Sequence, residues 1–270
     1  KGLMVMHTNC DKTRSNIMAY FNRIGYKGST NVSLKTLSQL QECHIYTVPY
    51  ENLDILNGVP LSLEIPNLFD KIVTRNRGGY CFELNTLFGW LLQSLGFEVT
   101  NYFARFWRDE PSTPAKRRHQ VLGVKVEDVH YLCDVGVGGL SPLRPIKITN
   151  ALVNEQNGEY YKLEHDTYFG WILYEKKRGQ WCKIYSFTEE PQLPQDYITT
   201  SFWCENAEDS PFTKRAKVAI RTTIGRNTIA DNEFRIFTPE GVRVFVPKTL
   251  KEYNKALYTH FGITMNDKLL

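Results

Sequence analysis

One stretch organises this sequence: Arg77-Gly78-Gly79-Tyr80-Cys81-Phe82-Glu83-Leu84-Asn85. The residues that follow repeat apolar side chains at i, i+3 and i+4, which predicts a buried or amphipathic helix; they are Leu84, Leu87, Phe88, Leu91, Leu92 and Leu95. Gly96 comes directly after them, where a left-handed helix end is favoured. Gly78 and Gly79 permit a sharp turn and close approach of other atoms before the helix. Cys81 therefore falls in or near the first helical turn.

The predicted position of Cys81 favours a reactive thiolate. Unpaired backbone N–H groups and the positive end of the helix dipole stabilise a negative charge there. A lone cysteine is nevertheless more often a small buried hydrophobic residue, so a catalytic role requires a nearby base. The other cysteines, at positions 10, 43, 133, 182 and 204, show no C-x-x-C pair and no metal-ligand spacing with the histidines. This pattern predicts reduced thiols, a cytoplasmic location and no metal site.

The composition is that of an ordinary globular protein. The chain has 270 residues, of which 42% are hydrophobic and 23% charged, which is enough for a sizeable core. The 33 basic and 29 acidic residues are too balanced to indicate nucleic-acid binding, although a local excess of charge would suit a small anionic ligand. No run approaches the roughly 18 apolar residues of a membrane span. The first residues also lack the apolar region of a signal peptide. We expect neither nucleic acid nor membrane as a partner.

The character of the sequence changes twice along the chain. Residues 1–95 are mostly helical, with helices predicted over 11–26, after an N-cap at Ser33, from Pro66 and from Cys81, and with an ordered turn over 48–53. Residues 96–190 read as antiparallel strands over 97–107, 119–126, 130–136, 160–165, 168–175 and 181–187. No crossover helices intervene, which favours a small barrel or curled sheet.

The third region, residues 191–270, mixes both kinds of element. A helix is predicted over 195–204, and short strands over 215–222, 226–230 and 233–237. The last helix is opened by a capping-box pattern at Thr249 and Glu252. The sequence thus predicts an α+β protein with three regions.

His119 is the candidate base, because it stands at the start of a predicted strand that would hold it rigidly. The remaining histidines are expected to be surface or capping residues; they are His7, His44, His130, His165 and His260.

Asp134 is the candidate orienting acid, because a carboxylate in an apolar strand requires a partner. A hairpin turning near residues 127–128 puts it on the strand next to His119, although a bulge or bend must correct the register between them. An ion pair of Asp134 with Arg105 remains open as an alternative. Spacing alone also does not place Cys81 beside His119. Glycines at 136, 138 and 139 would let a ligand approach the backbone.

These segments resemble those of the arylamine N-acetyltransferases, along nearly the whole chain. Residues 77–85 look like the nucleophile signature of that family, and Val48-Pro49-Tyr50-Glu51-Asn52-Leu53 is similar to its upstream turn, with Tyr50 where Phe is common. His119-Gln120-Val121-Leu122 and Leu132-Cys133-Asp134-Val135-Gly136-Val137-Gly138 look like its histidine and aspartate segments. The resemblance implies an N-terminal helical bundle (1–95), a central antiparallel β-barrel (96–190) and a C-terminal α/β lid (191–270). It also implies an active-site core like that of cysteine proteases and transglutaminases.

The resemblance further implies a Cys81-His119-Asp134 triad and ping-pong kinetics. Acetyl-CoA would acetylate Cys81, and an arylamine, a hydrazine or an N-hydroxyarylamine would then take the acetyl group, an activity of xenobiotic metabolism. Backbone N–H groups near Cys81 would stabilise the oxyanion.

Matching positions imply contacts with both reactants. Tyr50, Phe106 and Val137 would line the acceptor pocket, Gly136 and Gly138 would leave room for the pantetheine arm, and Ser210 and Phe212 would belong to a lid near coenzyme A. Core packing explains the aromatic residues equally well. The cluster Lys116-Arg117-Arg118 suits a solvated loop or coenzyme A phosphates. Val137 departs from the Phe that the family usually carries, which predicts a wider pocket and an altered acceptor preference.

Three other readings stay open from the sequence. A cysteine hydrolase and a macrolactam-forming amide synthase both use such a triad. A coenzyme-A-binding protein without turnover is the third, although an intact Cys81, His119 and Asp134 argue against an inactive enzyme.

Overall fold

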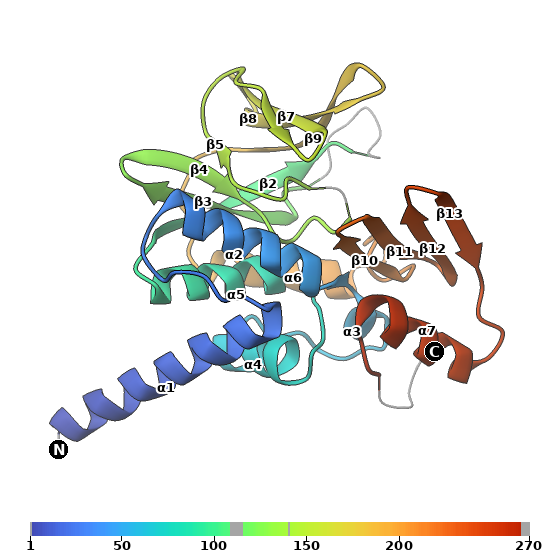
Figure 1. Ribbon diagram of the computed structural model, residues 1–270, viewed down its shortest axis with the longest axis horizontal. Coiled ribbons are helices and arrows are strands. Elements are labelled where there is room, and N and C mark those ends of the chain that lie inside the picture. The colour runs from blue at the N-terminus through green and yellow to red at the C-terminus, as the bar shows by residue number, and fades with distance from the viewer. Residues whose placement is uncertain (1, 109–115, 140, 266–270) are drawn as a thin grey trace.

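A computed structural model describes residues 2–108, 116–139 and 141–265, with side chains from residue 12 onward. Helices of the N-terminal part pack beneath a β-barrel, and a second sheet lies beside both (Figure 1). The predicted α+β class, with a helical bundle, an antiparallel barrel and a C-terminal α/β part, is confirmed.

The bundle contains α1 (Gly2–Ile24), α2 (Leu34–Thr47), α3 (Leu53–Leu56), α4 (Ile65–Phe69) with a π-helical turn over Asp70–Thr74, and α5 (Cys81–Ser94). Helix α1 begins well before the predicted residue 11. The sequence prediction misses this first part because the consecutive apolar residues 3–6 show no helical period. Ser33 caps α2 as predicted, since its side chain accepts a hydrogen bond from the Thr36 backbone N–H. Among the described residues, no helix has both the length and the hydropathy needed to cross a membrane.

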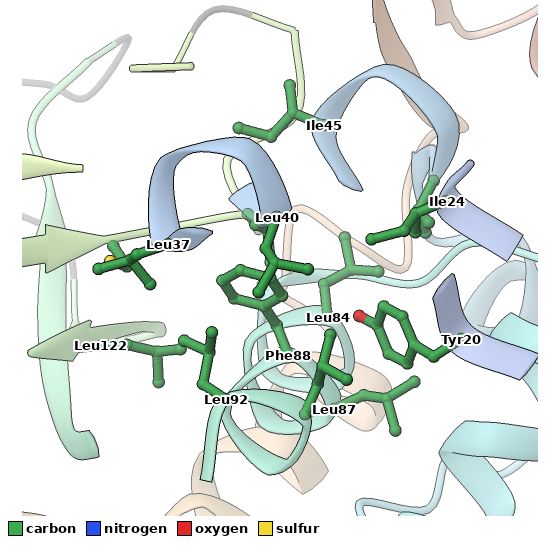
Figure 2. Close-up of a cluster of buried hydrophobic side chains, with 14 of the residues drawn as sticks. Tyr20, Ile24, Leu37, Leu40, Ile45, Leu84, Leu87, Phe88, Leu92 and Leu122 are labelled. Atoms are coloured by element: carbon green, nitrogen blue, oxygen red, sulfur yellow. The ribbon is translucent and has the colours of Figure 1, made fainter. Parts of the chain in front are cut away.

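Helix α5 is the centre of the bundle, because most of its residues are buried. Figure 2 shows its side chains meeting those of α1, α2 and β3; the labelled residues are Tyr20, Ile24, Leu37, Leu40, Ile45, Leu84, Leu87, Phe88, Leu92 and Leu122. Burial of each such side chain is worth about 1.5–3 kcal/mol. The N-terminus of α5 is therefore held rigidly by its own hydrophobic core.

The barrel consists of β2 (Glu98–Phe106), β3 (His119–Val126), β4 (Val129–Cys133), β5 (Ile146–Lys147), β6 (Asn154–Gln156), β7 (Glu159–Asp166), β8 (Gly170–Lys177) and β9 (Gln180–Phe187). Its eight strands are antiparallel in the order β5-β4-β3-β2-β9-β8-β7-β6, and a bridge between Asn150 and Leu163 nearly closes it. The six predicted strands are present. Strands β5 and β6 are too short to show alternation in the sequence.

The second sheet has five strands: β1 (Tyr50–Glu51), β10 (Lys217–Thr222), β11 (Gly225–Ala230), β12 (Glu233–Thr238) and β13 (Gly241–Phe245). Helix α7 (Leu250–Phe261) packs on it through Phe234, and Thr249 caps this helix as predicted. The turn predicted over residues 48–53 contains β1, which pairs with β10. Strand β13 is not predicted from the sequence. Because this sheet includes a strand from the first region, the division of the chain at residues 95 and 190 stays a prediction.

Candidate active site

Cys81 is the first residue of α5, as the sequence predicts. Tyr80 precedes it in an extended conformation, and the Tyr80 backbone N–H donates to Oε2 of Glu83 at 3.1 Å. The Cys81 side chain is 2% exposed and borders a cavity. The helix dipole and the unpaired N–H groups of the first turn therefore act directly on this thiol.

The double-glycine turn before Cys81 makes room for β1 rather than for a ligand. A Cβ atom at Gly78 would lie 2.0 Å from the carbonyl oxygen of Pro49. Gly79 forms a bridge with Tyr50, and its carbonyl accepts a hydrogen bond from the Glu51 N–H at 2.9 Å. The two glycines thus let the chain before Cys81 pack against β1.

His119 and Asp134 meet as predicted, although not through the strand that was expected. Strand β4 ends at Cys133, so the predicted strand over 130–136 is too long and Asp134 lies in the bend that follows. Leu122 faces Cys133 in the ladder, and the bend after Cys133 brings Asp134 back to His119. Nε2 of His119 and Oδ2 of Asp134 are 2.7 Å apart.

Asn85 organises the Asp134 side of the site, a role that sequence reasoning did not assign. Its Nδ2 donates to Oδ1 of Asp134 at 2.9 Å and to the Gln120 carbonyl at 2.7 Å, and its Oδ1 accepts from the Val135 N–H at 3.0 Å. The Gly136 N–H also donates to Asp134 Oδ1 at 2.8 Å. The available signal was an amide within the apolar run of this helix, one turn after Cys81.

The electrostatics of the Cys81 and His119 side chains are coupled. Burial alone would lower the pKa of His119, but Asp134 and the neighbouring Cys81 raise this pKa to about 9. Burial raises the pKa of the Cys81 thiol, while the hydrogen bond and charge of His119 act in the opposite direction. Because Asp134 occupies Nε2, Nδ1 is the ring nitrogen left for Cys81; it has no hydrogen-bond partner among the described residues, and the Cys81 thiol donates to the Arg118 carbonyl at 3.6 Å. The arrangement thus keeps a proton on His119 at neutral pH, facing the thiol.

A buried ion network supports the turn beneath Cys81. Nζ of Lys71 lies 2.8 Å from both Glu83 and Asp54, and Nη2 of Arg77 lies 2.7 Å from Glu51 and 2.8 Å from Asp54. Burial raises the pKa of Glu83, and Lys71 opposes that rise. The network ties α3, the π-helical turn and α5 together, so it fixes the direction in which α5 begins.

A cavity of about 680 Å³ opens above Cys81 and His119. This volume is typical of a small-molecule site. The predicted contact residues that line it are Tyr50, Phe106, Gly136, Val137, Gly138 and Phe212. Ser210 is not among its lining residues: its buried hydroxyl donates to the Cys204 carbonyl at 2.6 Å and accepts from the Phe212 N–H at 3.2 Å. Ser210 therefore shapes the loop that carries Phe212.

Gly136 and Gly138 allow parts of the protein itself to approach closely. A Cβ atom at Gly136 would lie 2.7 Å from both Cα of Cys81 and Nδ2 of Asn85. At Gly138, which has a φ of +72°, a Cβ atom would lie 2.8 Å from the Tyr50 side chain. Both glycines still border the cavity, but any larger residue would displace Cys81, Asn85 or Tyr50.

One wall of the cavity is basic and aromatic. Lys116 lies over the Trp203 ring at 4.4 Å, and Arg118 and Lys217 each lie 5.5 Å from the centre of the Phe212 ring. All five line the cavity. The third member of the predicted basic cluster, Arg117, pairs instead with Glu190 at 3.6 Å and is not part of this wall.

The expectation that His44 is a surface or capping residue is wrong. Its side chain is fully buried, and the ring lies 5.4 Å from that of Phe88 on α5. The position of a residue near a helix end does not show whether other parts of the chain bury its side chain. His130 and His165 are exposed and His260 is half-buried, whereas the side chain of His7 is outside the described residues. In the described part of the chain, no three His, Cys, Asp or Glu side chains are grouped to hold a metal ion.

Comparison with known proteins places this geometry in context. The chain matches the N-acetyltransferase family over residues 33–270. It is 34% identical over 256 residues to the arylamine N-acetyltransferase of Mycobacterium tuberculosis, an alignment that covers 93% of this chain and 90% of that protein.

Solved structures agree with the sequence comparison. The arylamine N-acetyltransferase structure from M. tuberculosis superposes with a TM-score of 0.85 at 33% identity, covering 91% of this chain and 92% of that one. The Mycobacterium marinum arylamine N-acetyltransferase in complex with CoA gives a TM-score of 0.84 at 31% identity, with 92% of each chain covered.

Proposed function

This chain belongs to the arylamine N-acetyltransferase family of acyltransferases, and we propose that it acetylates arylamines, hydrazines and N-hydroxyarylamines through a thioester on Cys81. The observation that carries the proposal is the position of His119, which contacts Asp134 through one ring nitrogen and faces Cys81 with the other. A nucleophile, a base and an orienting acid are the parts that acyl transfer through a thioester requires.

In the first half-reaction, Cys81 acts as the nucleophile. Its thiolate attacks the acetyl carbonyl of acetyl-CoA, and the C–S bond to coenzyme A breaks as the bond to Cys81 Sγ forms. The proton on His119 passes to the departing coenzyme A thiolate. The products are acetyl-Cys81, neutral His119 and free coenzyme A.

In the second half-reaction, neutral His119 acts as a base. It takes a proton from the amine nitrogen as that nitrogen attacks the thioester carbonyl. The acetyl group moves to nitrogen, and Cys81 leaves as a thiolate beside protonated His119. In both half-reactions, N–H groups of the first turn of α5 are suited to stabilise the tetrahedral oxyanion, because Cys81 begins that helix.

The cavity residues fit coenzyme A as the acetyl donor. Lys116, Arg118 and Lys217 supply positive charge for its phosphates, and Trp203 and Phe212 supply rings for its adenine. The CoA complex of the M. marinum relative supports this assignment. On the other side of the cavity, Tyr50, Phe106 and Val137 offer an apolar surface for the acceptor ring.

The proposal includes a cytoplasmic role in xenobiotic metabolism. The cysteines with described side chains, Cys43, Cys81, Cys133, Cys182 and Cys204, are free thiols. Free thiols are typical of reducing compartments, which supports the predicted location.

Intact mass after mixing the protein with acetyl-CoA, and no acceptor, tests the proposal directly. We expect a gain of one acetyl group with release of coenzyme A, and loss of the adduct on addition of an arylamine. Cys81→Ala should gain nothing. Cys204→Ala is the matched control, because Cys204 is a buried thiol in the same side-chain cluster, and it should gain the acetyl group normally. Absence of any adduct in the wild type would overturn the proposal in favour of a hydrolase or another acyl donor.

A further inference from the structure

A second cavity, of about 480 Å³, lies between helix α6 (Asp196–Asn206) and the segment that follows α3. Its volume is in the range of small-molecule sites. The residues that line it belong to two segments, 55–64 and 198–206, which the structure describes without a gap. None of these residues lines the cavity above Cys81. We call this second cavity the α6 groove.

Helix α6 separates the α6 groove from the active-site cavity. Four of the residues that it presents to the groove repeat at i, i+3, i+4 and i+7, which places them on one face of the helix: Ile198, Ser201, Phe202 and Glu205. Trp203 lies on another face, where it lines the active-site cavity and packs against Lys116. One helix therefore borders two cavities, and each cavity has its own lining.

The walls of the α6 groove are apolar and open to solvent. Phe202 is 66% exposed and Ile198 is 57% exposed, and Val59, from the segment after α3, is 48% exposed. Leu61 and Leu63 continue that segment and are half-buried. Large apolar side chains that gather around a concave surface, rather than being scattered singly, are typical of a binding site for an apolar group.

One carboxylate is held in place within these apolar walls. Oε2 of Glu205 accepts a hydrogen bond from the Leu61 N–H at 3.1 Å, and Oε1 accepts one from the Ser201 hydroxyl at 2.9 Å. Ser201 is itself fixed, because its Oγ lies 2.6 Å from the hydroxyl of the buried Tyr80. A carboxylate accepts about four hydrogen bonds in all, so both oxygens of Glu205 can still accept one from a ligand.

The α6 groove is negatively charged. Glu64 and Glu205 both line it, and none of its described lining residues is Lys, Arg or His. Among the residues that the structure describes, neither carboxylate has a basic side chain as a partner. Negative charge beside apolar walls is complementary to a molecule that joins an apolar body to one positive charge.

We propose that the α6 groove is a second ligand site of this protein, and that it binds small amphipathic cations, each with an apolar or aromatic body and one ammonium group. The apolar body lies against Phe202 and Val59, and the ammonium donates to Glu205 in a charge-assisted hydrogen bond. A protonated amine has no lone pair with which to attack an acyl group, so such a molecule is not an acetyl acceptor. The site is therefore separate from acceptor binding in both place and chemistry.

Calorimetric titration at pH 7 with 4-phenylbutylammonium, in the absence of any acetyl donor, tests the site. The neutral probe is 4-phenylbutanol, which keeps the ring and the chain but carries no charge. We expect the wild type to bind the cation roughly 10-fold more tightly than the alcohol, in the range for a hydrogen bond to a charged group. Glu205→Gln should bring the two affinities within about twofold of each other. Glu208→Gln is the matched control, because it removes an exposed carboxylate outside the groove, and the preference for the cation should remain.

A second variant tests the apolar wall and does not depend on the folding of the first. Phe202→Ser changes an exposed side chain, and we expect it to weaken the binding of both probes several-fold, because both lose the same apolar contact. Coenzyme A should not displace the cation, since the two cavities share no lining residue.

Three results would overturn the inference. The first is equal affinity of the wild type for the two probes, and the second is an unchanged preference for the cation in a folded Glu205→Gln together with unchanged affinities in Phe202→Ser. The third is displacement of the cation by coenzyme A, which would place the cation in the active-site cavity instead. Because no acetyl group takes part in these titrations, each of these results leaves the proposed function standing.

Discussion

Helix α5 lies between two histidines that are equally buried and electrostatically opposite. His44, on the bundle side, packs against Phe88, and the Tyr20 hydroxyl lies 2.8 Å from its Nδ1. Burial, with a contribution from Arg23, lowers the pKa of His44 to about 3. His119, on the barrel side, faces Asp134, and its pKa rises to about 9. Burial therefore makes a neutral structural histidine, and a buried carboxylate partner converts the same side chain into a proton donor.

The largest expected effect comes from removing that carboxylate charge. Asp134→Asn keeps the shape of the site but takes away what holds the proton on His119. We expect the rate of Cys81 acetylation to fall on the order of 10³- to 10⁴-fold. Single-turnover release of coenzyme A measures this rate, and Asp128→Asn, at the exposed β3–β4 turn, is the matched control. A loss below tenfold would mean that Asp134 is not what makes the two histidines differ.

The pH profile of the same half-reaction tests independently whether Asp134 raises the pKa of His119. In the wild type, protonated His119 persists up to about pH 9, so acetyl transfer should decline above that pH as the proton for the leaving thiolate is lost. In Asp134→Asn this decline should move to lower pH, since burial, which lowers the pKa of His119, is no longer opposed by the Asp134 charge. A decline at the same pH in both proteins would contradict the assignment.

The ion network beneath Cys81 tests the same principle with permanent charges. Arg77→Met leaves Glu51 without its arginine and Asp54 with Lys71 alone. Breaking a buried pair in this way costs about 3–5 kcal/mol of the free energy of unfolding. Denaturant titration measures it. Arg75→Met is the matched control, because Arg75 forms an exposed pair with Asp70 and should cost less than about 1 kcal/mol. Equal losses in the two variants would show that burial does not govern these charges.

His44 should make the fold less stable in acid. Its folded pKa lies below the ordinary value of 6.5, so the unfolded chain binds a proton first as the pH falls. The stabilisation is complete above pH 6.5 and is lost toward pH 3, at about 1.4 kcal/mol per pH unit. Between pH 7 and pH 5 we expect the free energy of unfolding to fall by about 2 kcal/mol from this residue.

His44→Gln isolates that contribution, because glutamine still offers Tyr20 an acceptor. The variant should lose this part of the pH dependence while Cys81 acetylation at pH 7 stays within about twofold of the wild type. Denaturant titrations at pH 7 and pH 5 give the comparison. An identical pH dependence in the variant and the wild type would mean that His44 already carries its proton in the fold.

The two histidines also mark what the sequence can and cannot predict. Local patterns located Cys81 at a helix start and His119 at a strand start, because helical periodicity, glycine turns and hairpins are properties of short segments. The same patterns placed Asp134 inside a strand that in fact ends at Cys133. The contact between Cys81 and His119 depends on how α5 packs against β3, which no short segment encodes. His44 was misassigned for the same reason, since the cover over a helix end comes from distant residues. The Lys71 network and Asn85 likewise acquire their roles only through tertiary contacts.

Val137 gives the smallest expected effect, and it separates the shape of the cavity from the chemistry of His119. Val137 lines the cavity and, like Phe106, packs against the barrel core; the Phe106 ring contacts His119. Val137→Phe adds a ring to the acceptor surface without touching the Asp134 contact. We expect the order of preference among arylamines of different width to change by about 10-fold or less, since such a change alters only a few contacts of one pocket wall. The single-turnover rate of coenzyme A release should stay the same. An unchanged order of preference, or an equal loss in both half-reactions, would mean that Val137 supports the site rather than selecting the acceptor.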